Sequence, residues 1–489
     1  MKYKELVKSI VLVLLFFTSL LLSSQIFFKT NAVSKSESNN NVVWINKKLN
    51  IKDYFCPQSY FVNFGGSLHT VLYNSDEKKE ITEIISNYFL QIDDLSSIIE
   101  IDYAVWQNAI EKKGVGFKLN FEMELDDIIS IYKNDDVDFQ EDFPVSQISL
   151  DINGDIYLRN KDKYYMSKTN IGKCEKLDFL INEIQDSYLE YRSVEKMYSL
   201  KKILQGDDDF KLNDELIPIM KIVDIPIIEV VDEVDITDEE NMAIKNYATR
   251  ILGENFIRKV YDYEGSIIYM TGYGEKALKI DNNGYFEYHE KIIENEEELT
   301  FLEGFKKSID ALSTINSLPS NIYISNYYKY NASGNEITRY EFNYSYGGYE
   351  VLLDNEESSA FIVEYNGSQL ISIKRKYKKF ISSINVNKIW ESALLINVVI
   401  DKNYDVIVRN YLRDNKIDVY SETSQYVYEV LQNIKTLEIK YYLKNIDNEE
   451  KLVPVWKFEI GNRIYFINIY DGIIVSSINQ EVDNGLEKN

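Results

Sequence analysis

The chain has 489 residues, of which 45% are hydrophobic and 27% are charged, a balance typical of globular proteins and unlike that of disordered chains. This length exceeds one typical hydrophobic core and predicts two or three domains. The formal net charge of −25 argues against nucleic-acid binding, which needs lysine and arginine to replace condensed counterions; the acidic surface either meets a basic partner or only maintains solubility.

The first predicted element is an apolar helix over residues 9–28, which contain no charged side chain. A helix of this length rises about 30 Å, the thickness of the hydrocarbon core of a bilayer. Three lysines precede the segment and only Glu5 opposes them, so the positive-inside rule keeps residues 1–8 as a cytoplasmic tail. We therefore expect a single-pass protein of the cell membrane whose bulk is extracytoplasmic.

A cleaved signal peptide is the alternative for the same segment, because residues 10–22 would serve as its apolar region. The apolar run continues to Phe28, however, and Thr30-Asn31-Ala32 is a poor cleavage site. The sequence therefore favours an uncleaved transmembrane anchor.

Ser19 and Ser23 are four residues apart and share one face of the predicted anchor. Small residues at this spacing can dock a neighbouring transmembrane helix, which makes this face a candidate partner-binding site. Serine is also common in anchors that dock nothing, so both interpretations stay open.

Residues 29–41 are rich in serine and asparagine and are predicted to form a stalk. An N-terminal extracytoplasmic domain is expected over residues 42–205. It opens with two strands within 57–73 that turn at Gly65-Gly66, followed by a helix whose apolar residues recur every three to four positions between Ile81 and Ile92. Several short strands and a long helical pattern over 173–204 follow.

A central domain over 206–382 and a C-terminal domain over 383–489 are expected to repeat a unit of one helix followed by antiparallel hairpins. The predicted helices end near Leu252, span 299–312 and 426–434, and include a shorter one near Trp390. Turn signals separate the expected strands, at residues 282–284, 333–335, 347–348, 366–367 and 471–472. The predicted fold class is therefore α+β, with a single N-terminal transmembrane helix and a multi-domain ectodomain of helix-plus-hairpin units.

Motifs for catalysis or for metal and cofactor binding are missing from the sequence. His69 and His289 are the only histidines, and zinc-protease, phosphate-loop and nucleophile-elbow motifs are absent. Ser67 and His69 could face one another on a strand, but nothing identifies the carboxylate and oxyanion donors that a hydrolase needs. Residues 207–209, three aspartates, lack the spacing of a calcium loop. A catalytic carboxylate pair depends on tertiary geometry and cannot be read from the sequence. We expect no enzyme activity, cofactor or metal.

Cys56 and Cys174 are the only cysteines. Outside the cytoplasm such a pair could form one disulfide, although a chain of this size does not depend on it. Whether the two residues pair stays open at this point.

Several segments resemble the YycH family. The basic N-terminus and anchor are followed by PQSYFVNFGGSLHTVLY at 57–73, by a strand pair at 277–280 and 284–288, and by a tyrosine- and glycine-rich turn at 344–353. Near the C-terminus, 452–457 and 465–472 resemble a hairpin shared with the sister family YycI and with PepSY-like modules. Residues 120–216 carry no such match.

The resemblance implies a non-enzymatic regulator of an essential sensor histidine kinase of the YycG/WalK type in Gram-positive bacteria. Such proteins act with a YycI-like sister protein and adjust signalling on cell-wall metabolism through transmembrane and ectodomain contacts. It also implies PepSY/YycI-like units in the ectodomain. The alternative function is an extracytoplasmic surface enzyme or binding module that acts on cell-wall polymers.

Overall fold

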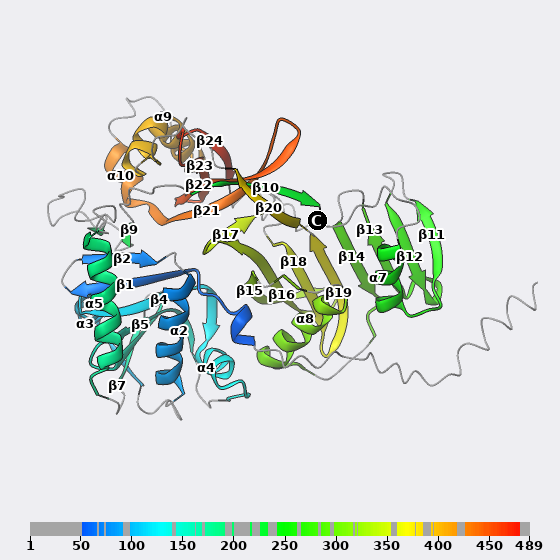
Figure 1. The fold of residues 1–489 in the computed structure, drawn as a ribbon, viewed down its shortest axis with the longest axis horizontal. Coiled ribbons are helices and arrows are strands. Elements are labelled where there is room, and N and C mark those ends of the chain that lie inside the picture. The colour runs from blue at the N-terminus through cyan, green and yellow to red at the C-terminus, as the bar shows by residue number, and fades with distance from the viewer. Residues whose placement is uncertain are drawn as a thin grey trace, which may run out of the picture. The chain divides into compact units, whose positions relative to one another are not determined.

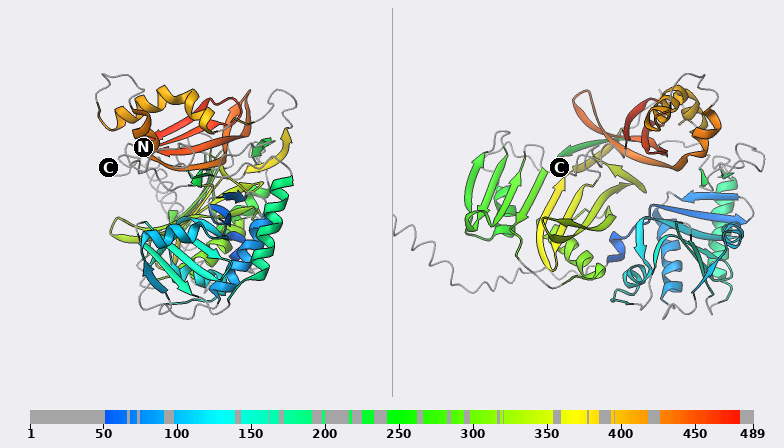
Figure 2. Two further views of the ribbon diagram at one scale, coloured as in Figure 1. Left: turned by 90° about the vertical axis from the view of Figure 1, so that its left-hand side faces the viewer. Right: turned by 180° about the vertical axis from the view of Figure 1, so that it is seen from behind.

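A computed structural model of the chain describes residues 51–479, except 66–67, 73–74, 91–97, 139–142, 162, 169–171, 191–197, 200–215, 218–224, 233–241, 262–265, 282–284, 294–297, 316–317, 320, 354–358, 377, 385–392, 395 and 418–425. All described residues belong to one compact unit, Leu49–Asn489. Figures 1 and 2 show the described elements.

Seven strands form the first sheet, in the order β2-β1-β4-β5-β6-β7-β3, and the neighbours pair antiparallel. The strands are β1 (Ser59–Gly65), β2 (Leu68–Leu72), β3 (Ile98–Ile101), β4 (Gly114–Glu124), β5 (Pro144–Asp151), β6 (Asp155–Asn160) and β7 (Lys163–Lys168). A short 3-10 helix, η1 (Ile51–Tyr54), precedes them.

Alternating side chains give this sheet two different faces. One face is apolar and packs against α2 (Ser75–Phe89), α4 (Leu125–Lys133) and α5 (Glu175–Glu190), as Figure 1 shows. Its buried residues on the strands include Tyr60, Val62, Val115, Phe117, Ile148, Leu150, Ile156 and Leu158. The other face carries polar side chains between larger apolar ones, and α3 (Tyr103–Ile110) covers part of it through Trp106.

The second sheet is larger and contains fifteen strands. Its strands are β10 (Ile227–Asp232), β11 (Ile257–Tyr261), β12 (Ile267–Thr271), β13 (Lys276–Ile280), β14 (Tyr285–Glu290), β15 (Ile322–Ala332), β16 (Asn335–Tyr346), β17 (Tyr349–Leu352), β18 (Phe361–Asn366), β19 (Gln369–Lys376), β20 (Lys378–Ile384), β21 (Ile434–Ile446), β22 (Glu449–Ile460), β23 (Arg463–Asn468) and β24 (Ile474–Asn479).

The strand order in this sheet is β11-β12-β13-β14-β19-β18-β16-β17-β21-β22-β10-β20, with β15 on β16 and β23-β24 on β22. The pairs are antiparallel apart from β17 and β21, which run in parallel. Figure 2 shows β10 beside the C-terminal strands. In the sequence, however, β10 comes before every other strand of this sheet.

Four helices accompany the second sheet: α7 (Met242–Leu252), α8 (Phe301–Ile315), α9 (Ile396–Asp414) and α10 (Val427–Gln432). A capping box starts α8, because the Thr300 hydroxyl accepts a bond from the Glu303 amide at 3.2 Å. The apolar face of α8, which includes Phe305 and Ile309, is buried in the core. A 3-10 turn, η3 (Gly272–Gly274), and a separate strand pair, β8 (Tyr198–Ser199) and β9 (Leu216–Ile217), complete the described elements.

The predicted fold class is wrong. The described residues form two large sheets, antiparallel and mixed, instead of successive helix-plus-hairpin units of PepSY/YycI type. The strands assigned to separate copies belong to one sheet, because β10 pairs with β20 and β22 and because β17 joins β21. Periodicity predicts each helix and hairpin locally, whereas the pairing between distant strands determines the architecture.

Several local predictions are confirmed. The helix expected from Ile81 onward is α2, the helices ending near Leu252 and spanning 299–312 are α7 and α8, and segment 57–73 forms the antiparallel pair β1-β2. The 333–335 turn joins β15 to β16 with positive φ at Ser333 and Gly334, as a tight hairpin requires.

Other local predictions differ from the structure. The helix expected over 173–204 is α5, which ends at Glu190, and the short strand β8 follows it. The helix expected to reach Ile434 ends at Gln432, because Ile434 starts β21. A shorter helix is expected near Trp390, but the helix that the structure describes in this region is the long α9, which begins at Ile396.

The predicted cytoplasmic tail (1–8), anchor (9–28) and stalk (29–41), the aspartates 207–209 and Trp390 lie outside the described residues. Within the ranges described above, no helix is long and apolar enough to cross a bilayer. The expected domain limits at 205/206 and 382/383 stay predictions; β20 runs through the second of them.

Candidate functional site

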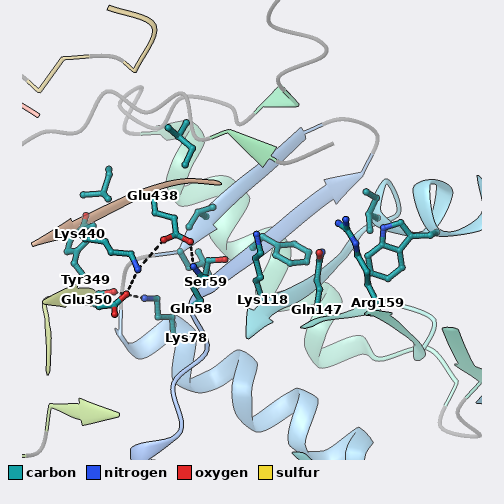
Figure 3. A pocket seen from close by; sticks show the side chains of 18 of the residues that line it. Gln58, Ser59, Lys78, Lys118, Gln147, Arg159, Tyr349, Glu350, Glu438 and Lys440 are labelled. Carbon is teal, nitrogen blue, oxygen red and sulfur yellow. Dashed lines mark hydrogen bonds and ion pairs between the residues drawn. The ribbon is translucent and has the colours of Figure 1, made fainter. Parts of the chain in front are cut away.

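A pocket lies between the polar face of the first sheet and the strands β17 and β21 of the second (Figure 3). Its volume is about 120 Å³, enough for several water molecules or a small ligand. The first sheet contributes one wall through β1, β4, β5 and β6, and α3 closes one end.

The sheet wall carries a row of four polar side chains, Ser59, Lys118, Gln147 and Arg159, which we call the donor row. Each member is paired in register with the next, on β1, β4, β5 and β6. Each member has a neighbour in the sequence that is buried in the apolar core, so alternation directs the donor row toward the opposite face, where the pocket lies; these neighbours are Tyr60, Phe117, Ile148 and Leu158. Figure 3 shows Lys118, Gln147 and Arg159 side by side.

Beside the donor row the wall is apolar. The Phe61 ring lies over Gly116, where an added Cβ would clash with that ring and would stand 2.5 Å from the carbonyl oxygen of Ile148. Glycine at this position therefore lets the ring pack directly against β4. Trp106 and Ile110 of α3 extend the apolar surface.

The opposite wall contains an ion cluster around Lys440. Its ammonium donates to Glu350 of β17 and lies 3.2 Å from the carboxylate of Glu438, two residues away on β21. Glu438 also accepts a bond from Gln58, just before β1, and Glu350 accepts one from Asn343 at 2.9 Å. Figure 3 shows Lys440 between the two carboxylates. The cluster thus links the second sheet to the start of the first.

Charge neighbours keep both carboxylates ionised. Burial would raise the pKa of Glu438, but the charges of Lys440, Lys457 and Lys118 lower it to about 2. The pKa of Glu350 is lowered in the same way, against burial, by Lys440 and Lys457. Burial would lower the pKa of Lys440, yet the two carboxylates raise it. The cluster is therefore a set of paired charges.

Lys78 of α2 also lines the pocket and contacts the second sheet. Its ammonium donates to the carbonyl of Gly348 at 2.9 Å, across the junction between α2 and the turn before β17. Burial lowers the pKa of Lys78. Lys78 therefore ties α2 to the turn before β17, while the bond from Gln58 to Glu438 ties the residue before β1 to β21.

The described residues that the sequence singled out, His289, Cys56 and Cys174, do not line the pocket. Ser19, Ser23 and Ser67 are outside the described residues, and only the backbone of His69 is described, opposite Asn63. His289 lies on β14, half exposed, with Nε2 2.9 Å from Glu287. Cys56 and Cys174 are both free thiols. Among the described residues no three His, Cys, Asp or Glu side chains are grouped as metal ligands.

Sequence reasoning missed the donor row and the ion cluster. Lys118 and Arg159 each follow a buried apolar residue, Phe117 and Leu158, so alternation could have placed them on the polar face of their strands. No local signal shows that β4, β5 and β6 are neighbours or that β21 lies across from them.

No protein-family model matches the chain, and no curated protein matches it. Among solved structures, the chain is similar to an uncharacterized protein from Eubacterium rectale ATCC 33656, with 10% identity and a TM-score of 0.32. The match covers 51% of this chain and 85% of the other. A likeness at this level carries no argument about fold or function.

Proposed function

We propose that the chain is a membrane-anchored, extracytoplasmic regulator that acts by binding and modulates a sensor histidine kinase of the YycG/WalK type, together with a YycI-like sister protein. The observation that carries the binding role is the pocket, because its walls come from both sheets. A molecule bound in the pocket contacts both sheets and stabilises the conformation of the chain to which it binds more tightly. A differential affinity of about 1–3 kcal/mol changes a coupled equilibrium roughly 5- to 150-fold.

One of the segments that resemble the family also lines the pocket. Residues 57–73 contribute Gln58, Ser59, Phe61, Val71 and Leu72 to it. The segments at 277–288 and 452–472 form the strand pairs β13-β14 and β22-β23. These placements support the resemblance at the level of segments, while the architecture of the second sheet departs from the expected YycI-like units.

The charge state of the pocket favours binding over glycoside hydrolysis. A glycosidase needs one carboxyl group whose pKa is raised so that it can donate a proton. Here Glu350 and Glu438 are the carboxyl groups in the lining, and Lys440 lowers the pKa of each. The pocket therefore lacks a proton donor of that kind among its described carboxylates.

Crosslinking in intact membranes, followed by purification of the full chain, tests the kinase partner. We expect a sensor histidine kinase to be recovered with it. Ser19→Leu with Ser23→Leu is expected to reduce that recovery, whereas Ser24→Leu, on another face of the predicted anchor, serves as the matched control. Recovery of the chain without any histidine kinase would contradict the proposal.

A binding module for cell-wall polymers is the second candidate, and the same pocket favours it. Purified full chain that retains labelled wall polymer, with no kinase in the crosslinked material, would support this candidate instead. Loss of retention in a pocket variant would place the polymer in the pocket.

A further inference from the structure

We propose that the pocket binds a small phosphate-bearing molecule, with its phosphate group held by the donor row. The proposal adds a ligand to the proposed regulator. Its test measures binding to the purified chain, so a failure here and a failure to recover a kinase are separate results.

The charge of the lining is opposite to that of the whole chain. Four cationic side chains line the pocket, against the two carboxylates of Glu350 and Glu438, in a protein with a net charge of −25. Both carboxylates are paired with Lys440, and Glu438 also lies within the electrostatic influence of Lys118. The four cations outnumber the two carboxylates, so the lining carries a net positive charge and an anion is the complementary ligand.

The chemistry of the donor row suits a phosphate group. Arg159 offers a planar fork that can bind two oxygens, and Lys118 adds a compact positive charge. The Gln147 amide and the Ser59 hydroxyl are neutral groups that can each donate a bond. No carboxylate is part of the row.

Spacing favours a phosphate over a carboxylate. Lys118 and Arg159 lie on strands separated by β5, so their backbones are about 10 Å apart and their long side chains can converge above Gln147. A tetrahedral phosphate presents three terminal oxygens and can meet donors from several directions. A carboxylate has only two coplanar oxygens and a single charge, so once the Arg159 fork binds both oxygens it offers Lys118 fewer acceptor directions and less charge than a phosphate does.

The size of the pocket limits the ligand. A volume of about 120 Å³ admits a small molecule but no folded partner. Phe61, Trp106 and Ile110 form an apolar surface beside the donor row, which suits a small apolar or ring-shaped group that carries the phosphate. The phosphate can belong to a soluble molecule or to a lipid headgroup, since both present the same group.

Calorimetric titration of the full chain in detergent micelles with phenyl phosphate tests the proposal, with benzoate as the carboxylate counterpart. We expect phenyl phosphate to bind, benzoate to bind at least about tenfold more weakly, and added NaCl to weaken binding. Lys118→Gln and Arg159→Gln should each raise the Kd about tenfold or more, because each removes a charge-assisted bond. Lys163→Gln, an exposed lysine on β7 outside the pocket, should leave it unchanged.

Gln147→Glu provides a second variant that keeps the size of the side chain. It places a carboxylate between Lys118 and Arg159 and should abolish phenyl phosphate binding while the circular dichroism spectrum stays that of the parent. Equal binding of benzoate, no binding of phenyl phosphate, or binding that survives all three pocket variants would overturn the proposal. Displacement of phenyl phosphate by phosphatidate in mixed micelles would support a lipid headgroup as the source, and displacement by glycerol phosphate alone would support a soluble one.

Discussion

Lys440 shows how single residues hold the junction beside the pocket. The side chain is 6% exposed and contacts carboxylates from two strands, so its burial is balanced by two opposite charges. Desolvation makes such a cluster a weak source of net stability, yet breaking it is costly because the remaining charges stay buried.

Replacing Lys440 with methionine should lower the free energy of unfolding by about 3–5 kcal/mol, because Glu350 and Glu438 lose their partner. Urea unfolding of the purified chain measures this change. The triple variant Lys440→Met with Glu350→Gln and Glu438→Gln removes the charges together and should recover most of the loss. A single variant as stable as the parent would show that the cluster does not hold the junction.

Acid should destabilise the folded chain partly through Glu438. Its pKa in the folded protein is about 2, below the ordinary value of 4.5, so the carboxylate stabilises the folded state above about pH 5. That contribution is lost as the pH falls from about 5 toward 2. Thermal unfolding across this range should show a shallower pH dependence in Glu438→Gln than in the parent, and parallel curves would contradict the assignment.

At the scale of elements, α8 shows how a neighbouring strand can determine which residue a helix carries. Gly304 is the fourth residue of this helix, and alanine is normally preferred to glycine inside a helix by about 1 kcal/mol. An added Cβ, however, would stand 2.6 Å from Cζ of the Tyr340 ring on β16. The Tyr340 hydroxyl donates to the carbonyl of Phe301 at 3.2 Å, which holds the ring against the helix.

Gly304→Ala should therefore destabilise the chain by about 1–3 kcal/mol, as overpacking of a core does, despite the higher helix propensity of alanine. Ser313→Ala, near the end of the same helix, is the control for a small change without a clash. Adding Tyr340→Phe should restore part of the loss, since it removes the hydroxyl that the new methyl group meets. Melting temperatures of the variants measure these effects.

Elements with a clear local pattern were predictable and those defined by distant partners were not. The apolar positions of α2 and α8 repeat at helical spacing, and the turn at Ser333-Gly334 is readable directly. The length of α9 was missed, because charged residues interrupt its apolar positions between Ile396 and Asp414. For the candidate site, alternation predicts which face Lys118 occupies, but its cross-strand neighbour Gln147 is known only from the register of β4 and β5.

At the scale of the whole molecule, the net charge of −25 opposes the compact state through self-repulsion. Added salt screens this repulsion, with a Debye length that falls to about 8 Å at physiological ionic strength. The chain thus combines a strongly negative net charge with a positive pocket lining. Added salt should therefore stabilise the fold but weaken the binding of an anion in the pocket.

The melting temperature of the full chain should rise as NaCl is increased from near zero to about 0.15 M, whereas binding of phenyl phosphate should weaken over the same range. Sucrose at matched osmolality controls for general solvent effects. A melting temperature that falls with salt would mean that attractive ion pairs outweigh the net repulsion.

The placement of β10 also sets an order of assembly. The strands of the first sheet lie close together in the sequence, so that sheet can pair early during synthesis. Ile227 of β10 pairs with Ile384, and Ile228 pairs with Leu452, so β10 waits for strands made much later. Contacts of this separation form slowly and leave strand edges exposed meanwhile. A chain truncated before β22 would keep every strand of its first sheet but would leave one edge of β10 open to pairing with other chains.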